Sequence, residues 1–176
     1  LTFASHLKQK IMAMVGKKFP SVSIDAMSEM GDDLKINIFE EAVNKKSKVL
    51  LFWYPKDFTF VCPTELHAFQ EALPEFAKRN TLVIGASCDT NEVHFAWLNT
   101  AKDNGGIEGV TYPLLADTHR QLADILGILD QEIEYTEEGD AIFSGSNVTY
   151  RATYLVDETG KVFHESVNDM PLGRNV

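Results

Sequence analysis

The chain has 176 residues, of which 44% are hydrophobic and 24% charged, and its formal net charge at pH 7 is −10. This composition is typical of one soluble globular domain, expected over residues 1–176. The negative charge disfavours nucleic acid and anionic membranes as partners, and no apolar run reaches the roughly 20 residues of a membrane helix. Two cysteines are too few for a disulfide framework, which favours a reducing, cytoplasmic location. Because the chain starts at Leu1 rather than Met, a removed organelle address stays an alternative.

Apolar runs and capping residues predict alternating strands and helices over most of the chain. Strands are expected at Leu34–Ile36, Val49–Tyr54, Thr81–Ala86 and Leu114–Ala116. Helices are expected after Asn37, with Glu40 three residues on as in a capping box, and over Thr64–Lys78, Asn91–Lys102 and Thr118–Leu126. Pro74 predicts a kink or break in the second of these helices.

The pattern changes near the C-terminus, where Thr149–Val156 and Lys161–Val167 flank the hairpin turn Asp157–Gly160. Alternating strands and helices followed by a hairpin predict an α/β fold with a central mixed β-sheet and helices on both faces. Between the two parts, Asp130–Asp140 carries six carboxylates and no base. This segment predicts a solvated acidic loop, with docking to a basic partner as the less favoured alternative.

Cys62 follows a buried strand and a short loop, and Pro63 after it suits a helix start. The unpaired N–H groups and positive dipole end of a helix stabilise a thiolate there. An ordinary cysteine pKa of about 8.5 leaves only about 3% thiolate at pH 7. Lowering the pKa by about three units raises this fraction roughly thirtyfold but lowers nucleophilicity roughly 15- to 30-fold. A fast thiol therefore also needs groups that stabilise the leaving atom.

Several residues are candidates for that task. Thr59 can place its hydroxyl beside the sulfur, and Pro55 would shield the pocket from water. Arg151 is the candidate cation because a planar guanidinium can contact two oxygens at once. On sequence alone its pairing with a surface carboxylate is the favoured alternative, and Arg174 is equally ambiguous. Cys88 ends a buried strand and is expected to be a core residue.

The segment Phe58–Glu65, preceded by Pro55, resembles the active-site signature of typical two-cysteine peroxiredoxins of the alkyl hydroperoxide reductase C type. Other segments similar to that family are Gly16–Pro20, Val83–Ser87, His94–Trp97, Tyr112–Asp117, Tyr150–Thr153 and Val167–Arg174. The resemblance implies a thioredoxin-like fold and a thiol-dependent peroxidase in antioxidant defence, which reduces hydrogen peroxide and organic hydroperoxides.

The same resemblance implies the roles of the reacting groups. Cys62 is the peroxidatic nucleophile, which is oxidised to a sulfenic acid. Thr59 and Arg151 hold the peroxide oxygens, and Pro55 shields the thiolate.

Supporting groups and partners are also implied by the resemblance. Glu65 orients the arginines, with Arg174 as its partner, and no metal, flavin or haem cofactor is required. The electron donor is thioredoxin or a flavoprotein disulfide reductase. A homodimer through the edge strand Lys161–Val167 and a decamer of such dimers are expected.

Two features depart from the family pattern. The resolving cysteine expected in a C-terminal arm does not occur before Val176, so the arm is expected to lie beyond this residue, with an outside thiol as the alternative. The family's Gly-Gly-Leu-Gly element reads Gly105-Gly106-Ile107-Glu108, which leaves the sensitivity to over-oxidation open.

Other functions fit the sequence less well. A disulfide oxidoreductase needs Cys-x-x-Cys, but Glu65 occupies the second cysteine position. The histidines that a Cys–His hydrolase or a zinc site would need are scattered, at His6, His67, His94, His119 and His164. A redox-regulated, chaperone-like oligomer is the non-enzymatic alternative.

Overall fold

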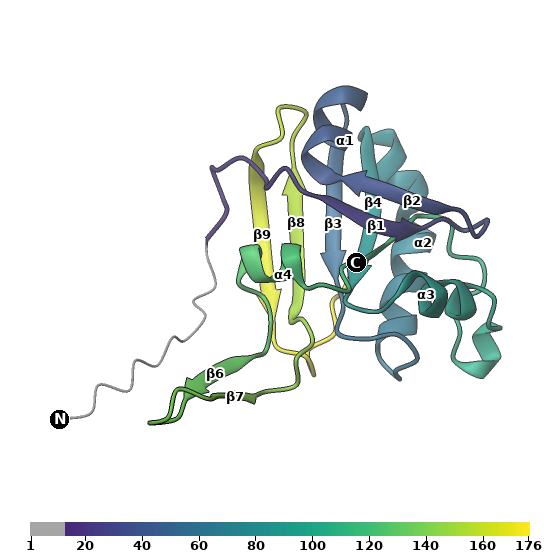
Figure 1. Cartoon of the computed structure of the whole chain (residues 1–176). Coiled ribbons are helices and arrows are strands. Elements are labelled where there is room, and N and C mark those ends of the chain that lie inside the picture. Colours follow the sequence, from purple (N-terminus) through teal and green to yellow (C-terminus); the bar gives the residue numbers. More distant parts are fainter. Residues whose placement is uncertain (1–12) are drawn as a thin grey trace.

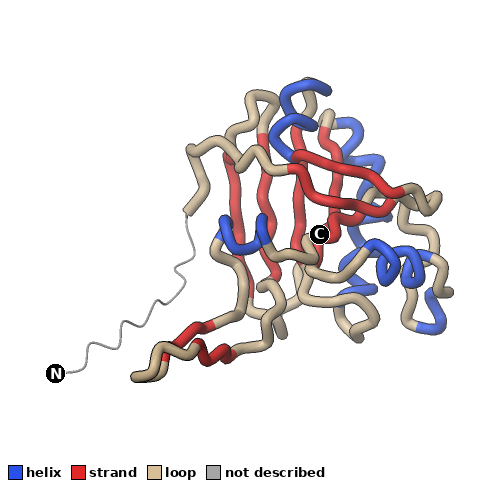
Figure 2. Tube along the Cα trace, viewed as in Figure 1, coloured by secondary structure: helices blue, strands red, loops and turns tan. Residues whose placement is uncertain are grey.

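The computed structural model describes residues 13–176, so His6 lies outside the described residues. A seven-stranded sheet in the order β2-β1-β5-β4-β3-β8-β9 forms its centre (Figures 1 and 2). Its strands are β1 (Ser23–Met27), β2 (Asp33–Asn37), β3 (Lys48–Trp53), β4 (Thr81–Ser87), β5 (Leu114–Ala116), β8 (Arg151–Val156) and β9 (Val162–Asn168). Strand β4 runs parallel to β3 and β5, whereas the other pairs are antiparallel. The predicted mixed sheet is confirmed.

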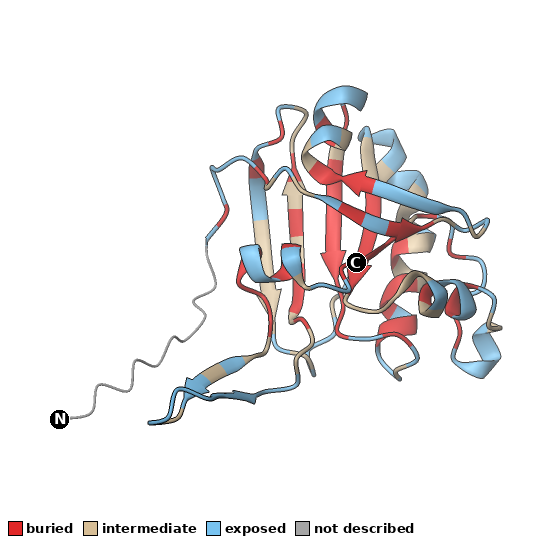
Figure 3. Ribbon diagram, viewed as in Figure 1, coloured by how far each residue is buried: buried red, intermediate tan, exposed pale blue. Residues whose placement is uncertain are grey.

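Helices cover both faces of this sheet, as predicted. They are α1 (Ile38–Lys45), α2 (Cys62–Lys78), α3 (Asn91–Leu98) and α4 (Gln121–Leu126), with a 3₁₀ turn at Lys102–Asn104. Successive residues of β3 point to opposite faces and enter two separate buried clusters, one shared with α1 and α4 and one with α2 and α3. The sheet centre is accordingly buried (Figure 3). This arrangement is the thioredoxin-like fold.

Helix α2 is not broken at Pro74, although a break was one of the two outcomes predicted there. The helix begins at Cys62, earlier than the predicted Thr64, and runs without a break to Lys78. Proline removes one backbone hydrogen bond from a helix interior. Leu73 and Phe76, on either side of the proline, pack against the buried cluster under α2, and this burial holds the helix together.

Helices α3 and α4 are shorter than predicted. Helix α3 ends at Leu98 because the Thr100 hydroxyl, rather than its N–H, donates to the Ala96 carbonyl (2.8 Å), while that N–H donates to the Trp97 carbonyl (3.1 Å). Helix α4 starts only at Gln121. There the carboxylate of Asp117 accepts a hydrogen bond from the backbone of Ala123 (2.8 Å) and so marks the helix start.

The acidic segment was predicted as a loop, and this was wrong. It forms a separate antiparallel ribbon of β6 (Glu132–Tyr135) and β7 (Ala141–Ser144), which we call the β6–β7 ribbon. The turn between the strands uses Gly139 at φ 91°, and apolar residues alternate with carboxylates along β6. The sequence prediction rested on the number of carboxylates in this segment and therefore missed the alternation. The predicted exposure is confirmed, because most of the ribbon faces solvent (Figure 3).

Candidate active site

Cys62 is the first residue of α2, and its side chain is fully buried. Val61 occupies the N-cap position without a side-chain hydrogen bond, and Pro63 lies in the first turn. The unpaired N–H groups and positive dipole of the helix start therefore act on the Cys62 sulfur. The predicted position of this thiol is confirmed.

Arg151 is the cation that the fold brings to Cys62. It is the first residue of β8, and β8 runs antiparallel to β3, so Arg151 lies at the sheet end where β3 stops and the loop to α2 starts. Its Nη1 lies 3.5 Å from the Cys62 Sγ, and the whole residue is buried. The alternative of pairing with a surface carboxylate is wrong.

Glu65 joins the two arginines. It lies one helical turn after Cys62, is buried, and accepts hydrogen bonds from Arg151 Nη1 and from Arg174 Nε (3.0 Å). The Arg174 guanidinium also lies 5.2 Å from the centre of the Phe52 ring, within cation–π range. Two guanidinium groups share one carboxylate, so the cluster has an excess of one positive charge beside the sulfur.

The last described residues close this centre. Arg151 Nε donates to the Met170 carbonyl (2.6 Å), and the backbone N–H of Arg174 donates to Glu65 Oε1 (2.8 Å). Arg174 Nη1 also donates to the Ala152 carbonyl (2.9 Å). The segment from Met170 to Arg174 is thus a wall of the site, and the ambiguous Arg174 becomes part of the buried cluster.

The loop between β3 and α2 carries the other two predicted residues. The Thr59 hydroxyl donates to the Lys56 carbonyl (3.1 Å) rather than lying hydrogen-bonded to Cys62. Pro55 is buried at the start of the loop. Phe58 has φ 54°, a rare conformation for this residue type, and its ring lies 5.9 Å from that of Trp97. The loop therefore folds tightly, with Thr59 turned toward its own backbone.

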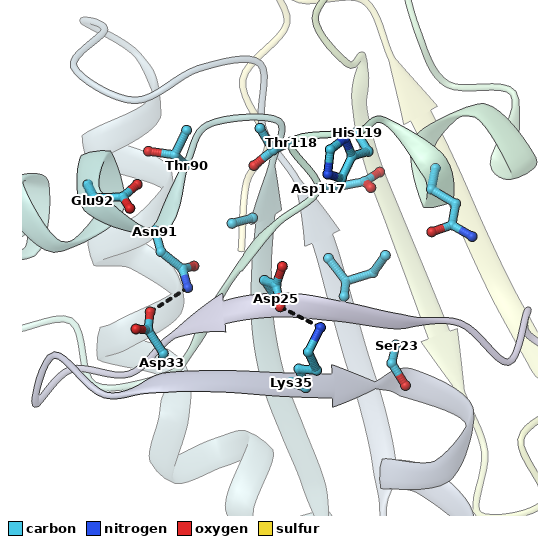
Figure 4. A pocket seen from close by; sticks show the side chains of 13 residues that line it. Ser23, Asp25, Asp33, Lys35, Thr90, Asn91, Glu92, Asp117, Thr118 and His119 are labelled. Atoms are coloured by element: carbon cyan, nitrogen blue, oxygen red, sulfur yellow. Dashed lines mark hydrogen bonds and ion pairs between the residues drawn. The ribbon is translucent and has the colours of Figure 1, made fainter.

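Two pockets differ in their relation to this centre. A pocket of about 400 Å³ opens beside the loop and is lined by Thr59, Phe60 and Pro63 among others. A polar pocket of about 510 Å³ lies between β1, β2 and the start of α3. Figure 4 shows that its polar groups pair with one another, as in the contacts Lys35–Asp25 (2.9 Å) and Asn91–Asp33 (2.8 Å). None of its lining residues belongs to the Cys62 centre.

Comparisons with known proteins agree with this geometry. The model of the AhpC/TSA family matches residues 15–165. This chain belongs to the AhpC/TSA family. It is 37% identical over 165 residues to alkyl hydroperoxide reductase C of Buchnera aphidicola subsp. Baizongia pistaciae, covering 94% of this chain and 76% of the relative. It is 38% identical over 164 residues to peroxiredoxin-1 of Gekko japonicus, covering 93% and 74%.

Solved structures give the same result for the fold. The reduced 2-Cys peroxiredoxin of Plasmodium vivax has a TM-score of 0.79 at 32% identity, with 94% of this chain and 77% of that one covered. The chain described here is therefore a thiol-dependent peroxidase, as the resemblance of its sequence to the peroxiredoxins implied. The chaperone-like alternative is not favoured by these relatives.

A buried contact between Asp57 and His94, which the sequence did not reveal, anchors the loop between β3 and α2. Asp57 lies in the loop, and its carboxylate contacts His94 Nδ1 (2.7 Å), while His94 Nε2 contacts the Leu115 carbonyl (3.1 Å). Both side chains are buried. Burial by itself lowers the pKa of His94, but the hydrogen bond and charge of Asp57 outweigh it, so this pKa is raised. Burial likewise raises the pKa of Asp57, against the opposing effect of His94.

The second cysteine has no such activating environment. Cys88 is partly buried against the main hydrophobic cluster. Burial, and secondarily the charge of Asp117, raise the pKa of its thiol to about 12. A thiol of this kind is unreactive at neutral pH, in agreement with the predicted core role of Cys88.

Within residues 13–176, no cluster of three or more His, Cys, Asp or Glu side chains is arranged to hold a metal ion. In the same part of the chain, no helix combines the length and apolarity needed to cross a bilayer.

Proposed function

We propose that Cys62 is the peroxidatic thiol of this peroxidase and that hydrogen peroxide and organic hydroperoxides are its substrates. The observation that carries this proposal is the contact of 3.5 Å between Arg151 Nη1 and the buried Cys62 sulfur. A guanidinium in a water-poor site interacts more strongly with developing charge than it would in bulk solvent. The Cys62 centre is therefore suited to cleaving a bond whose leaving group becomes anionic.

The reaction follows from this placement. The Cys62 thiolate attacks one peroxide oxygen, an S–O bond forms, and the O–O bond breaks. Sulfur is oxidised to a sulfenic acid, and the peroxide is reduced to water or an alcohol after the leaving oxygen takes up a proton. The N–H groups of Arg151 stabilise that leaving oxygen, and Glu65 holds the guanidinium in position.

Thr59 and Pro55 have supporting roles in the proposal. The Thr59 hydroxyl now donates to the Lys56 carbonyl, and it would turn from this carbonyl to a peroxide oxygen on substrate binding. Buried Pro55 keeps water from the sulfur. The pocket of about 400 Å³ lined by Phe60 and Pro63 would accommodate the apolar part of an organic hydroperoxide.

Regeneration of the thiol requires an outside electron donor. We infer thioredoxin or a flavoprotein disulfide reductase, either of which a reducing compartment such as the cytoplasm would supply. The first thiol to attack the sulfenic acid would be a resolving cysteine beyond Val176 or the donor's own. We also infer a homodimer formed through the edge strand β9, with assembly into a decamer.

The proposal is tested by mass spectrometry after one equivalent of hydrogen peroxide, with dimedone as a trap for sulfenic acid. The adduct is expected at Cys62, and Cys88 should remain a free thiol. Peroxide consumption with dithiothreitol as reductant should persist in Cys88→Ser and be absent in Cys62→Ser. Labelling at Cys88 alone would contradict the assignment of Cys62.

A further inference from the structure

The peroxidase chemistry leaves the β6–β7 ribbon unexplained. Its register pairs Ile133 with Phe143 and Tyr135 with Ala141, so these four side chains share one face. On this face Tyr135 is 61% and Phe143 63% exposed. A two-stranded ribbon is marginally stable by itself, and clustered exposed aromatic residues mark contact surfaces. The face therefore fits a partner that would cover it.

The charge of the ribbon limits the chemistry of that partner. Residues 130–140 carry six carboxylates, and the sequence has no Lys or Arg from position 130 to position 150. Asp130 is already engaged, because its carboxylate accepts hydrogen bonds from the N–H (3.0 Å) and hydroxyl (2.6 Å) of Ser146. This contact fixes the base of the ribbon, while the tip with Glu137 and Glu138 is exposed. A complementary surface combines apolar side chains with lysines.

Such a surface exists on the same chain, at the other end of β9. Lys17, Lys18 and Lys161 are exposed there, and Lys18 forms a β-bridge with Lys161. We call these three residues the lysine cluster. Beside it lie the exposed apolar side chains of Val15 (54%) and Phe163 (46%).

The ribbon does not reach the lysine cluster of its own chain. The ribbon leads into Arg151, the first residue of β8, and Arg151 pairs with Asn168 at the end of β9. The cluster lies at the start of β9. Strand β9, from Val162 to Asn168, separates the two by about 20 Å at about 3.3 Å per residue. In Figure 1 the ribbon extends outward at the lower left, past the end of β9.

A second copy would bring the two surfaces together. Residues 16–18 hydrogen-bond to the start of β9 through Gly16 N–H to Val162 O (2.8 Å) and Val162 N–H to Lys17 O (2.9 Å). The later residues of β9 remain available as an edge within the described part of the chain. When two such edges pair antiparallel about a twofold axis, the start of one β9 lies next to the end of the other.

We propose that the β6–β7 ribbon is an arm that holds a second copy of this chain. Its aromatic face packs on the partner's apolar side chains Val15 and Phe163, its acidic tip with Glu137 and Glu138 contacts the partner's lysine cluster, and the twofold axis repeats the contact. The inference rests on the β9-edge homodimer and not on the peroxidase chemistry.

Zero-length cross-linking tests the contact directly. Equal amounts of ¹⁵N-labelled and unlabelled full chain are mixed and treated with a carbodiimide, which joins carboxylates to lysines in contact. Links from Glu137 or Glu138 to Lys17, Lys18 or Lys161 are expected between two copies and not within one. Some of them should join a labelled to an unlabelled peptide, and all should occur in particles with the mass of a dimer. Absence of ribbon-to-cluster links between copies would overturn the proposal.

A charge exchange tests its energetics. Glu137→Lys with Glu138→Lys, and separately Lys17→Glu with Lys18→Glu, should each raise the dimer dissociation constant about tenfold, since several exposed pairs are lost twice by symmetry. Combining all four changes should return the constant to within about threefold of the starting protein. Asp103→Lys with Glu108→Lys, two exposed positions between α3 and β5, is the matched control.

Sedimentation velocity over a concentration series measures these constants. Equal constants in the ribbon variant, the control and the starting protein would also overturn the proposal. Sulfenic acid formation at Cys62 is followed in the same samples and should not change. A variant that loses this reaction would therefore point to a fault in the proposed function or in folding, separate from the arm.

Discussion

The Cys62 centre and the β6–β7 ribbon both concentrate charge, but they do so in opposite environments. In the centre, one carboxylate and two guanidinium groups are buried and hydrogen-bonded to one another. In the ribbon, all charged residues are carboxylates, and they face solvent. Buried charges interact strongly and destabilise the protein when one partner is removed, whereas exposed charges are screened and contribute little to folding. This difference predicts that substitutions in the centre have large effects on activity and stability, whereas substitutions in the ribbon have small effects that depend on a partner.

The largest expected effect is the loss of the nucleophile. Cys62→Ser should lower the rate constant for peroxide reduction by at least about a thousandfold, because a neutral hydroxyl does not replace a thiolate. Stopped-flow measurement of peroxide consumption checks this. Cys88→Ser is the matched control and should keep its rate; a similar loss in both variants would contradict the contrast between the two thiols.

Replacing the guanidinium next to the thiol comes second. Arg151→Lys keeps the charge but loses the planar fork that contacts both Cys62 and Glu65. We expect the rate constant of Cys62 oxidation to fall about 100-fold, a usual cost of removing one positioned donor. The exposed Arg79→Lys serves as the control, and an unchanged rate in Arg151→Lys would rule out a role for the fork.

The buried carboxylate should matter most for stability. Glu65→Gln leaves two buried guanidinium groups without a counter-charge, so the free energy of unfolding should fall by about 3 kcal/mol. Urea denaturation followed by circular dichroism measures this loss. Glu71→Gln changes an exposed carboxylate of the same helix and should leave the unfolding midpoint almost unchanged; equal midpoints for the two variants would show that the cluster does not stabilise the fold.

The pair of Asp57 and His94 predicts a pH dependence of stability. The pKa of His94 is raised in the folded protein, so the folded state holds this proton more tightly than the unfolded chain. The resulting stabilisation is fully present below the ordinary pKa of about 6.5 and is lost as the pH rises through the higher folded pKa. The difference in unfolding free energy between the protein and His94→Gln should therefore be largest near pH 6 and shrink in alkaline buffer. His119→Gln, at an exposed histidine, is the matched control.

The smallest effect on folding is expected in the ribbon. Phe143→Ser removes a side chain that is mostly in solvent, so the unfolding free energy of the dilute protein should change by less than about 0.5 kcal/mol. Measured again at high protein concentration, the variant should be less stable than the starting protein, because a second copy then covers the face. A large loss at both concentrations would mean that Phe143 belongs to the protomer core.

Signals within a few residues of Cys62 were readable from the sequence. Pro63 indicated a helix start, and the apolar run before the loop indicated a central strand. The course of α2 past Pro74 and the end of α3 were less well predicted, because the packing of Leu73 and Phe76 and the side chain of Thr100 decided them. The β6–β7 ribbon was missed because its charge obscured a short alternating pattern.

Contacts between side chains that lie far apart in the chain could not be predicted from local sequence patterns. Glu65 contacts Arg151 across 86 positions and Arg174 across 109. The resemblance to peroxiredoxins indicated these residues, but not that Arg151 is buried or that Thr59 donates to its own loop. His94 appeared as one of several scattered histidines until the fold placed it against Asp57.

The amino-acid sequence alone determined where a reactive thiol would lie, because helix capping and apolar periodicity act within one or two turns of the chain. Only the tertiary structure decided which charges meet that thiol. The antiparallel pairing of β8 with β3 brings Arg151 to the start of α2, and such pairing depends on the packing of the whole sheet rather than on any short segment.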